Sequence, residues 1–434
     1  MERNIRNELQ AWKQSPYRKP LIIRGARQVG KTYSILEFGN SYEGKVHQIN
    51  FEKNPQFKNI FEEDLDANRI RLELETILNT DIVENVDLLF FDEIQSCPKA
   101  IMSLRYFYEQ IPEIHIVAAG SLLEFALNSI SFPVGRVQFM ELHPMSFSEY
   151  LRALSKHKIA EIINSEPKKV SQIVHQTIIN ELFNYFFIGG MPEAVKYFRD
   201  YGKLSGVRDI HESLIATYIQ DFSKYSPTVD IDCLINVLIS TAKSVGTQIK
   251  YSKLSVGFSN PTIKKAFNAL NRARLISKVK SSSVSGLPLE AGVNSKKFKS
   301  LFLDIGLMSH LNGMLNKYVD LKHNINSIFK GALAEQFVGQ EMLSNKQKQL
   351  YYWARETKSS TAEIDYLLEK KGKIIPVEVK SGSSGSLKSL HFLLETFPQI
   401  EESYIFSIAE YGKHNRTKLH FIPIYYTAKM SSQD

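Results

Sequence analysis

Residues Gly25 to Thr32 read G-A-R-Q-V-G-K-T. Every fixed position of the phosphate-binding P-loop pattern G-x-x-x-x-G-K-[ST] is present in this stretch. The apolar run Leu21 to Ile23 comes directly before it and predicts a buried strand, and the residues from Tyr33 to Phe38 predict a helix after it. A strand, a glycine-rich loop and a helix in this order predict an α/β nucleotide-binding domain of the P-loop type.

The residue types in this loop suit a nucleoside triphosphate. Glycines let the backbone curl so that N–H groups point at phosphate oxygens, and the helix N-terminus adds its positive end. We expect the Lys31 ammonium to reach the β- and γ-phosphates of ATP, and the Thr32 hydroxyl to ligate Mg²⁺. The alternative is an ordinary glycine-rich turn, and a second motif argues against it. The predicted nucleotide-binding residues are Gly25, Ala26, Arg27, Gln28, Val29, Gly30, Lys31, Thr32 and Tyr33.

That second motif is a pair of carboxylates after another apolar run. Leu88 to Phe91 predicts a buried parallel strand, and Asp92 and Glu93 stand at its C-terminal end, where open α/β sheets place their ligands. Asp92 would hold Mg²⁺ directly or through water, and Glu93 would orient and polarise the attacking water. Alone, such a run describes many solvated strand ends. Together with the P-loop it predicts hydrolysis of ATP.

Two further residues are candidates for contact with the γ-phosphate. Ile114 to Ala119 predicts a strand that lies beside the P-loop strand, and Ser121 follows it. Ser121 would act as a sensor of the γ-phosphate or of the attacking water, or would cap the next helix instead. Arg136 would stabilise charge in the transition state, within its own subunit or on a neighbour. The alternative for Arg136 is a surface arginine beside a strand.

Bulk composition limits the class of protein. The chain has 434 residues, 43% hydrophobic and 23% charged, which predicts a globular protein of two to four domains. Its two cysteines are far apart, which excludes a disulfide scaffold or a zinc ribbon and favours a reducing cytoplasm. The polar N-terminus lacks the apolar core of a signal peptide, and no apolar run is long enough to span a membrane. The net charge of +8 permits a nucleic-acid partner without demonstrating one.

Changes of pattern along the chain predict four parts. Strands alternate with helices in residues 1–150, which predicts the P-loop parallel sheet, and residues 151–231 predict a helical lid. Residues 232–310 predict helices followed by two strands, the layout of a winged helix-turn-helix. Residues 326–434 predict a last α/β domain.

The third of these parts carries basic residues on its last predicted helix, residues 262–275. They would meet nucleic-acid phosphates if this helix were a recognition helix. The alternative is a protein-binding winged helix with a solvated basic face. The residues are Lys264, Lys265, Arg272 and Arg274.

The last part holds a second set of residues that suits a defined chemistry. Glu335 lies on a predicted helix, Asp365 on a strand, and Glu378 and Lys380 on the next strand, where positions i and i+2 share one face. A carboxylate on one strand and E-x-K on the next is the arrangement of the PD-(D/E)xK, or restriction-endonuclease-like, nuclease fold. The proline usual before the aspartate is replaced by Ile364.

In that fold each residue has an expected role in phosphodiester hydrolysis. Asp365 and Glu378 would hold a divalent metal, Mg²⁺ or Mn²⁺, that lowers the pKa of a bound water. Glu335 would add a ligand or hold one in place, and Lys380 would orient the water or stabilise the charge that develops on phosphate. The alternative is a pair of strands with exposed, salt-bridging charges.

These stretches together resemble a known family, the bacterial and archaeal AAA-type ATPases that carry a C-terminal domain of unknown function. The resemblance spans nearly the whole chain. It implies an AAA-type core with a helical lid, a winged helix and a restriction-endonuclease-like domain. Because many AAA-type proteins form rings in which an arginine reaches the neighbour's nucleotide, a homo-oligomer is left open. The matching stretches are Arg24 to Thr32, Phe91 to Gln95, Ala119 to Glu124, Gly135 to Val137, Leu142 to Tyr150, Gly189 to Glu193, Leu303 to Leu307 and Pro376 to Lys380.

Two functions remain open at this point. In the first, ATP hydrolysis drives DNA or RNA processing by the chain's own C-terminal nuclease. In the second, the chain is a nucleotide-dependent switch or scaffold whose C-terminal domain binds nucleic acid or a protein without cutting. The complete set of acidic residues and lysine favours the first function, and the lack of a strongly basic tract near them favours the second.

Overall fold

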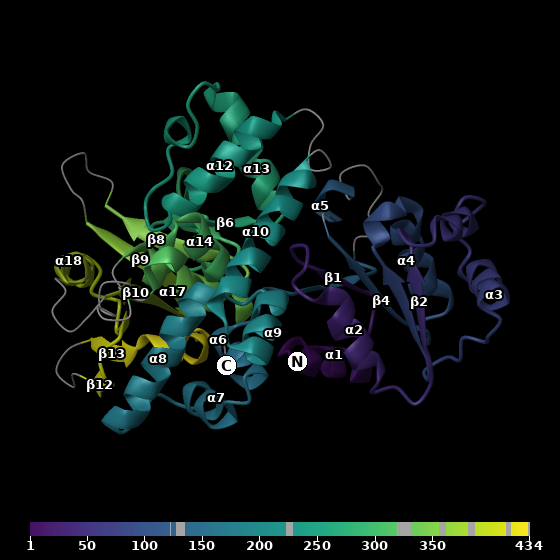
Figure 1. Cartoon of the computed structure of the whole chain (residues 1–434), viewed down its shortest axis with the longest axis horizontal. Helices are drawn as coiled ribbons and strands as arrows, with labels where there is room; N and C mark the ends of the chain where they lie inside the picture. The colour runs from purple at the N-terminus through teal and green to yellow at the C-terminus, as the bar shows by residue number, and fades with distance from the viewer. Residues whose placement is uncertain are drawn as a thin grey trace. The chain divides into compact units, whose positions relative to one another are not determined.

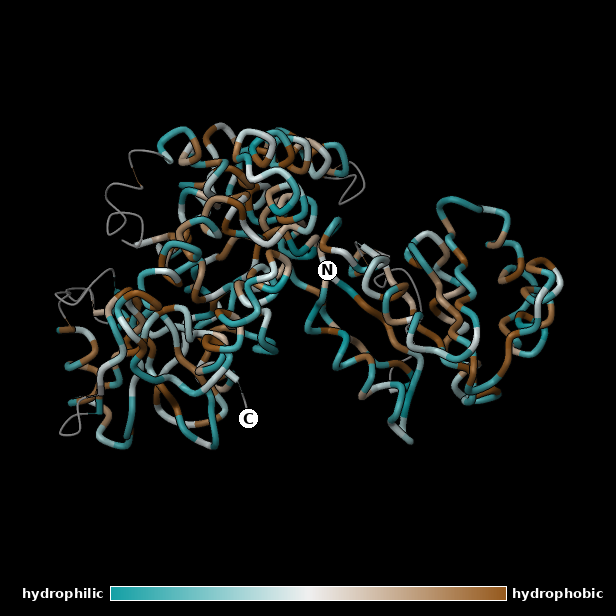
Figure 2. Tube along the Cα trace, turned by 60° about the horizontal axis from the view of Figure 1, so that its bottom comes forward, coloured by the Kyte–Doolittle hydropathy of each residue, from teal (hydrophilic) through white to brown (hydrophobic). Residues whose placement is uncertain are grey.

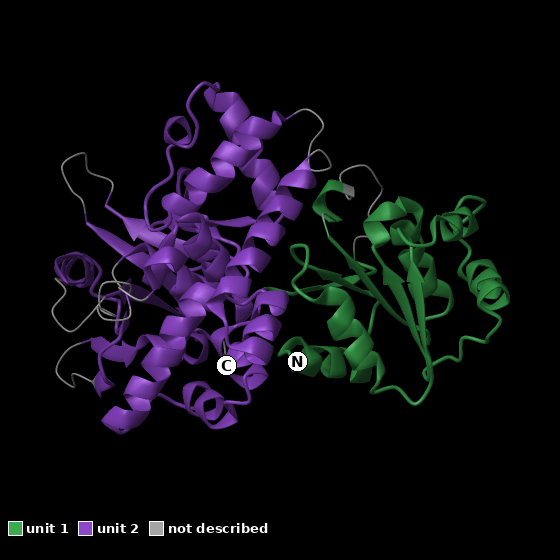
Figure 3. Ribbon diagram, viewed as in Figure 1, with its two compact units in different colours: residues 1–143 green, residues 144–434 purple. Residues whose placement is uncertain are grey.

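The protein is described from a computed structural model. It describes residues 1–121, 123–126, 135–222, 229–318, 321, 331–355, 362–380, 387–413 and 418–432. The chain divides into two compact units, Met1–His143 and Pro144–Asp434, which Figure 3 shows in green and purple. The first boundary lies close to the one predicted at residue 150. The finer division of the second unit into lid, winged helix and nuclease-like domain stays a prediction.

The first unit is built on a five-stranded sheet with the strand order β2-β3-β4-β1-β5, in which all pairs are parallel. The strand β4 lies between β1 and β3, as the sequence predicts for the strand that ends before Ser121. The sheet is therefore that of a P-loop NTPase (Figure 1). The strands are β1 (Leu21–Arg24), β2 (Val46–Asn50), β3 (Leu88–Asp92), β4 (His115–Gly120) and β5 (Gln138–Glu141).

Helices pack on this sheet because its strands are apolar on both faces. All residues of β3 and β4 are buried, and the sheet strands are among the hydrophobic (brown) stretches of this unit in Figure 2. Alternate strand residues such as Phe91 and Ile116 share a core with α3 and α4, whereas α2 contacts β3 and β4 and carries α1. The helices are α1 (Ile5–Gln14), α2 (Lys31–Gly39), η1 (Pro55–Phe61), α3 (Ala67–Leu78), η2 (Ile94–Ser96), α4 (Pro98–Gln110) and α5 (Leu123–Ala126).

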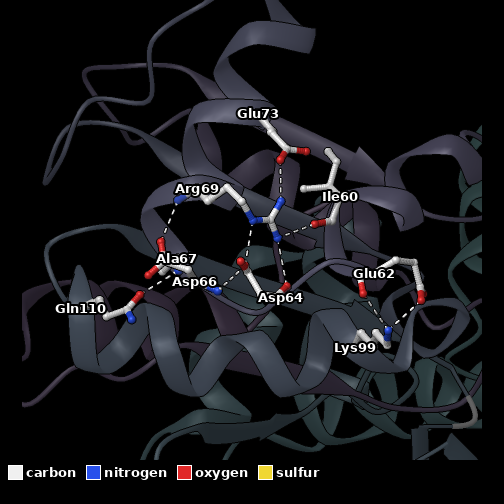
Figure 4. A network of polar contacts seen from close by, with 9 residues as sticks. All are labelled: Ile60, Glu62, Asp64, Asp66, Ala67, Arg69, Glu73, Lys99 and Gln110. Atoms are coloured by element: carbon white, nitrogen blue, oxygen red, sulfur yellow. Dashed lines mark hydrogen bonds and ion pairs between the residues drawn. The ribbon is translucent and has the colours of Figure 1, made fainter.

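A polar network fixes the start of α3 (Figure 4). The Asp66 carboxylate accepts from the backbone N–H of Arg69, which caps the helix. The Arg69 guanidinium donates to Asp64 at 2.8 Å, to the carbonyl oxygen of Ile60 at 2.9 Å, and to Glu73 one turn further on. One arginine thus ties the end of η1 to the first two turns of α3.

The second unit contains a mixed sheet of eight strands in the order β12-β13-β11-β10-β9-β8-β6-β7. The hairpin β6–β7 follows the helices α12 and α13, and β6 pairs in parallel with β8. The hairpin of the predicted winged helix is therefore hydrogen-bonded into the sheet of the part that the sequence predicts to be nuclease-like. The strands are β6 (Ile276–Ser282), β7 (Val293–Phe302), β8 (Leu350–Ala354), β9 (Glu363–Lys370), β10 (Lys373–Val379), β11 (Ser403–Ser407), β12 (Gly412–Lys413) and β13 (Leu419–Pro423).

Helices make up the rest of the second unit. The α8 helix ends just before Gly189, which has a φ of +71°, and α9 begins with Pro192, a residue suited to the first position of a helix. The longer helices are α6 (Phe147–Ala153), α7 (His157–Asn164), α8 (Gln172–Ile188), α9 (Pro192–Tyr201), α10 (Leu204–Gln220), α12 (Ile231–Lys243), α13 (Asn260–Arg272), α14 (Ile305–Leu311), α17 (Ala332–Ser344) and α18 (Lys388–Thr396). The short ones are η4 (Tyr251–Lys253), η5 (Leu289–Gly292), η6 (Met314–Lys317), η7 (Ile424–Tyr426) and α19 (Thr427–Ser431).

A buried carboxylate joins two of the motifs that carry the family resemblance. Asp304 accepts from the backbone N–H of Gly190 at 2.6 Å and of Gly306 at 2.9 Å. A side chain at Gly189 would come within 2.0 Å of the same carboxylate, so this position requires glycine. The G-G turn and the aspartate are therefore one structural joint between α8 and α14.

Candidate functional site

The P-loop has the backbone that a phosphate cradle needs. A Cβ on Gly25 would meet the carbonyl oxygen of Leu142 at 2.2 Å, and Gly30 has a φ of +94°. Gln28 also has a positive φ, +64°, which a non-glycine residue adopts only when its surroundings impose it. Both glycines of the motif are thus required by geometry, one by a close approach and one by its conformation.

Lys31 is folded across this loop. Its ammonium donates to the carbonyl oxygens of Gly25 at 3.1 Å and Ala26 at 2.8 Å, and the side chain is buried. These carbonyls belong to the first turn of the loop. The positive charge of Lys31 therefore lies at the P-loop itself, where a bound phosphate would meet it.

Thr32 and Asp92 come together from different elements, as the sequence predicts. The Thr32 hydroxyl at the start of α2 donates to Asp92 Oδ1 at the end of β3 over 3.1 Å. The other oxygen of Asp92 accepts from the side-chain amides of Gln48 and Asn50 on β2, each at 3.0 Å. A hydroxyl and a carboxylate side by side under the phosphate loop are the donor set that fits Mg²⁺.

Glu93 is held in an unusual conformation beside this pair. Its φ is +51°, in the left-handed region, and the Gln95 amide donates to its Oε2 at 2.7 Å. The other amide atom of Gln95, Oε1, is buried and has no hydrogen-bond partner in the described part of the chain, and a Cβ on Gly120 would come within 2.4 Å of it. Gln95 thus fills the space between the Glu93 carboxylate and the end of β4, which fixes where that carboxylate points.

Ser121 and Arg136 lie at opposite edges of the sheet. Ser121 is buried and follows β4, whose Gly120 pairs with Arg24 at the P-loop end of β1. Arg136 precedes β5, whose first residue pairs with the first residue of β1, so it lies at the edge away from the P-loop. There it forms an ion pair with Glu109 at 2.9 Å. The structure brings Ser121 to the nucleotide edge and does not bring Arg136 to it within one subunit.

In the second unit, the predicted nuclease residues converge with two residues that the sequence analysis missed, Lys299 and Glu363. Lys299 on β7 reaches Glu335 on α17 at 3.2 Å, and Glu363 at 2.6 Å and Asp365 at 3.7 Å, both on β9. Only 3% of the Lys299 side chain is exposed. A single lysine in a strand is usually a surface residue, so the sequence gives no signal for this role.

Glu378 and Lys380 pair with each other on the neighbouring strand. The Lys380 ammonium contacts Glu378 Oε1 at 2.5 Å, and Glu378 Oε2 is buried with no hydrogen-bond partner among the described residues. Asp365 Oδ2 accepts from the backbone N–H of Val379 at 2.8 Å, which links β9 to β10 at this point. All the predicted members of the cluster thus lie on neighbouring elements, with Lys299 among three of the carboxylates.

Burial and like charges shape the pKa values in this cluster. Burial and the Asp365 carboxylate raise the pKa of Glu335 to about 8 and that of Glu378 to about 7. Burial works against the charge of Lys299, but the carboxylates of Glu335, Asp365 and Glu363 outweigh it and raise the Lys299 pKa. The lysine is thus held in its charged form by the acids around it.

The cluster does not fit a metal ion in this arrangement. Among the described residues, no group of three or more histidine, cysteine, aspartate and glutamate side chains has the geometry to hold one. Lys299 lies within 4 Å of Asp365 and Glu335, two of the three carboxylates predicted to serve a metal, and of Glu363. The segment Ser381 to Ser386, which the sequence predicts to be a flexible loop beside the site, lies outside the described residues.

Comparison with known families agrees with the geometry of the first unit. Residues 17–151 match the family model of the AAA domain. We refer to these residues as the AAA domain. Two domains of unknown function match the remainder, DUF8612 over residues 179–318 and DUF4143 over residues 330–426. The resemblance to AAA-type ATPases is thus confirmed for the AAA domain, and the families matched by the second unit carry no stated activity.

Similar solved structures are distant. The Walker-type ATPase PABY2304 of Pyrococcus abyssi is 15% identical, with a TM-score of 0.45, 71% of this chain and 95% of that chain covered. The Orc1 protein of Aeropyrum pernix in complex with DNA is 11% identical, with a TM-score of 0.33, 74% of this chain and 94% of that chain covered. A RuvB variant of Thermotoga maritima is 14% identical, with a TM-score of 0.31, 64% and 89% covered. A search of curated proteins found no match.

The first unit holds a further P-loop contact that the sequence analysis missed, made by a residue before the AAA domain. The Arg3 guanidinium, just before α1, donates to the carbonyl oxygen of Val29 at 2.8 Å and to that of His143 at 2.7 Å. Arg3 is 6% exposed. No motif marks this residue, since it lies more than 20 positions before the P-loop in a polar segment.

Within the described residues, no helix is both long enough and apolar enough to cross a membrane.

Proposed function

We propose that the AAA domain binds ATP with Mg²⁺ and hydrolyses it, and that the nucleotide controls nucleic-acid binding by the second unit. The observation that carries the first half is the 3.1 Å contact between Thr32 and Asp92 under a P-loop whose lysine is already turned inward. Mg²⁺ would neutralise charge on the β- and γ-phosphates. In this proposal the hydroxyl of Thr32 and the carboxylate of Asp92 hold the ion.

Other residues of the AAA domain would bind the nucleotide and activate water. The backbone from Gly25 to Gly30 would receive the phosphates, with Tyr33 exposed on the first turn of α2 beside them. Glu93 would orient the attacking water, because its carboxylate is fixed by Gln95 at the same sheet edge. Ser121 would contact the γ-phosphate or that water from the end of β4.

Two variants test this half. Lys31→Ala should lose nucleotide binding, and Glu93→Gln should bind ATP with near-normal affinity and fail to turn it over. Binding is measured by titration with a fluorescent ATP analogue, and turnover by phosphate release. If Glu93→Gln releases phosphate at the normal rate, the water-orienting residue is another one.

For the second half, the α13 helix is the candidate nucleic-acid surface. It buries Ile263, Phe267 and Leu270 and leaves Lys264 and Lys265 exposed. Together with Arg272, near the end of the same helix, they form a basic face opposite the core. The order of α12, η4, α13 and the β6–β7 hairpin is the order expected of a winged helix-turn-helix and supports phosphate contact by α13.

Cleavage of the nucleic acid is the point on which the two functions differ. The cluster of Glu335, Asp365, Glu378 and Lys380 supplies the residues of a nuclease, but Lys299 lies among its carboxylates. We therefore favour the switch that binds without cutting. Plasmid and single-stranded DNA are incubated with the protein and Mg²⁺ or Mn²⁺, with and without ATP. Cleavage that is lost in Asp365→Ala would instead establish the nuclease.

A further inference from the structure

Lys299 is placed as the centre of the carboxylate cluster by the hairpin β6–β7. Its ammonium is 2.6 Å from Glu363, 3.2 Å from Glu335 and 3.7 Å from Asp365, so its charge is shared among carboxylates from two other elements. A lysine ammonium has three N–H donors and no acceptor, which suits a position surrounded by acids. The Tyr352 ring lies 5.4 Å from the same ammonium.

We propose that Lys299 is the resident cation of this cluster, and that it holds the place of a divalent metal so that the cluster binds none. Mg²⁺ takes oxygen ligands at about 2.0–2.1 Å in a near-octahedral shell. An ammonium within hydrogen-bond distance of Glu335 and Glu363 and a divalent ion on the same carboxylates would repel each other at contact distance. One of the two cations must therefore leave before the other can bind.

Asp365 and Glu378 are each engaged through one oxygen by a neighbouring donor, whereas Glu378 Oε2 has no hydrogen-bond partner among the described residues. Asp365 Oδ2 accepts from Val379 N–H, and Glu378 Oε1 is paired with Lys380. A Cβ on Gly246, at the turn after α12, would lie 3.0 Å from Glu335 Oε1, so the backbone of that turn closely approaches this carboxylate. The side chains of Glu335 and Asp365 are each only 15% exposed.

The role of this ion cluster is then to fasten strand β7 to α17 and β9. The hairpin contributes the cation, and the nuclease-like part contributes the anions. Buried charges of this kind are stable only as a complete set, because removal of one partner leaves the others uncompensated. The cluster would work as a fixed joint in the second unit, and phosphodiester chemistry would have no metal to use there.

The test compares metal binding by the protein that retains Lys299 with metal binding by Lys299→Met. The whole chain is used without nucleotide, and every protein also carries Asp92→Asn so that the P-loop site does not contribute. Mn²⁺ binding is followed by calorimetric titration and by the shift of the thermal midpoint. We expect no Mn²⁺-dependent shift when Lys299 is present. The Lys299→Met variant should unfold at a lower temperature without metal, and Mn²⁺ should raise its thermal midpoint by several degrees. Its Kd for Mn²⁺ should be at least tenfold lower than that of the protein that retains Lys299.

The matched control is Lys280→Met on the adjacent strand β6. Lys280 also pairs with a glutamate, Glu290 at 2.8 Å, but this pair is more exposed. We expect Lys280→Met to leave both the thermal midpoint and the Mn²⁺ response unchanged. If it behaves like Lys299→Met, the effect is not specific to the cluster and the proposal fails.

Mn²⁺ binding by the protein that retains Lys299 tests the proposal even if Lys299→Met does not fold. Millimolar or tighter Mn²⁺ binding by that protein, abolished in Asp365→Asn, would overturn the proposal. Absence of such binding would support it. Because no nucleotide is present, this outcome does not depend on whether the AAA domain hydrolyses ATP, so failure here and failure of the proposed function are told apart.

Discussion

Arg3 donates a hydrogen bond of 2.8 Å to the carbonyl oxygen of Val29, which lies inside the P-loop 26 residues later. The same guanidinium holds the carbonyl oxygen of His143, so the segment before α1 links the phosphate loop to the end of the sheet. Both acceptors are backbone atoms. The hydrogen bonds therefore depend on the position of the loop and serve to keep it in place before a nucleotide arrives.

Removal of the Arg3 guanidinium should weaken nucleotide binding without abolishing it. A charge-assisted hydrogen bond contributes about 1.5–3 kcal/mol, part of which Arg3→Gln should remove. We expect the Kd for ATP to rise roughly tenfold, which corresponds to about 1.4 kcal/mol. Arg6→Gln, which changes an exposed arginine in the first turn of α1, is the control and should bind ATP normally. Equal affinity in both variants would show that Arg3 only stabilises the fold.

Gln95 should affect turnover and not binding. Its amide holds one oxygen of Glu93 at 2.7 Å, and its removal frees a carboxylate that sits on a strained backbone. We expect Gln95→Ala to lower kcat for ATP roughly tenfold, about 1.4 kcal/mol in the barrier, with the Kd unchanged. Phosphate release under saturating ATP measures this. An unchanged kcat would mean that Glu93 needs no support from Gln95.

Arg136 should act on a neighbouring subunit if it acts in catalysis. It precedes β5 at the sheet edge away from the P-loop and pairs with Glu109. Arg136→Ala and Lys31→Ala should each be inactive, but a mixture should recover part of the activity, because one supplies the nucleotide site and the other the arginine. Turnover per subunit should also rise with protein concentration. A mixture that stays inactive would assign Arg136 a surface role.

The basic face of α13 should account for salt-dependent binding of nucleic acid. For each phosphate that the protein no longer neutralises, the slope of log K against log salt should become shallower by about 0.7–0.9. We therefore expect the variant with Lys264→Ala and Lys265→Ala to bind DNA more weakly and with a slope shallower by roughly 1–2. Lys158→Ala on α7, another exposed lysine, should leave both quantities unchanged. A salt slope that does not change would place the phosphate-binding surface elsewhere.

Glu341 should make the second unit less stable as the pH rises. Burial raises its pKa to about 8, from an ordinary value near 4.5, although its carboxylate accepts from the N–H of Phe147 at 2.8 Å. The folded state therefore holds a proton that the unfolded state has released. The stabilisation is complete below about pH 4.5 and is lost as the pH rises through about 8.

Glu341→Gln keeps the acceptor oxygen and removes this titration. One pKa unit corresponds to about 1.4 kcal/mol, which in a domain of this size shifts the thermal midpoint by roughly 2–4 °C or more. We expect the two proteins to melt alike at pH 5 and the glutamine variant to melt higher at pH 8.5. Glu161→Gln, in an exposed pair with Lys158, should show no such divergence. A constant difference across the pH range would contradict the assignment.

Local patterns predicted the elements of the AAA domain well because its motifs join adjacent segments. The strand before Gly25 and the helix after Thr32 are adjacent to the loop in the sequence, so their residues necessarily lie close to it. Thr32 and Asp92 are 60 positions apart, yet their meeting could be predicted, since parallel strands bring their C-terminal ends to one edge. The same rule does not bring Arg136 to the P-loop, because Arg136 precedes its strand and so lies at the N-terminal ends of the parallel strands.

Long-range contacts that carry no motif were beyond the reach of sequence patterns. Lys299 reaches Asp365 across 66 positions through the pairing of β6 with β8, and nothing in the local pattern of β7 indicates that partner. Arg3 and Val29 are a similar case, since arginine before a helix is common. Residues that belong to a motif, such as Glu378 and Lys380, could be found from their spacing. A single charged residue on a distant element, such as Lys299, could not be found this way.

The ladder between β6 and β8 has a practical consequence for dissection of the chain. Val279 pairs with Leu350 and Ser281 with Tyr352, so the hairpin and the nuclease-like strands complete one sheet. A fragment that ends before residue 331 would leave β6 with bare N–H and C=O groups along one side, and such an edge recruits other chains. The second unit is therefore best expressed as one polypeptide. If either the β6–β7 part or the part that contains β8 were replaced by another domain, that domain would have to supply a strand that pairs with the exposed edge.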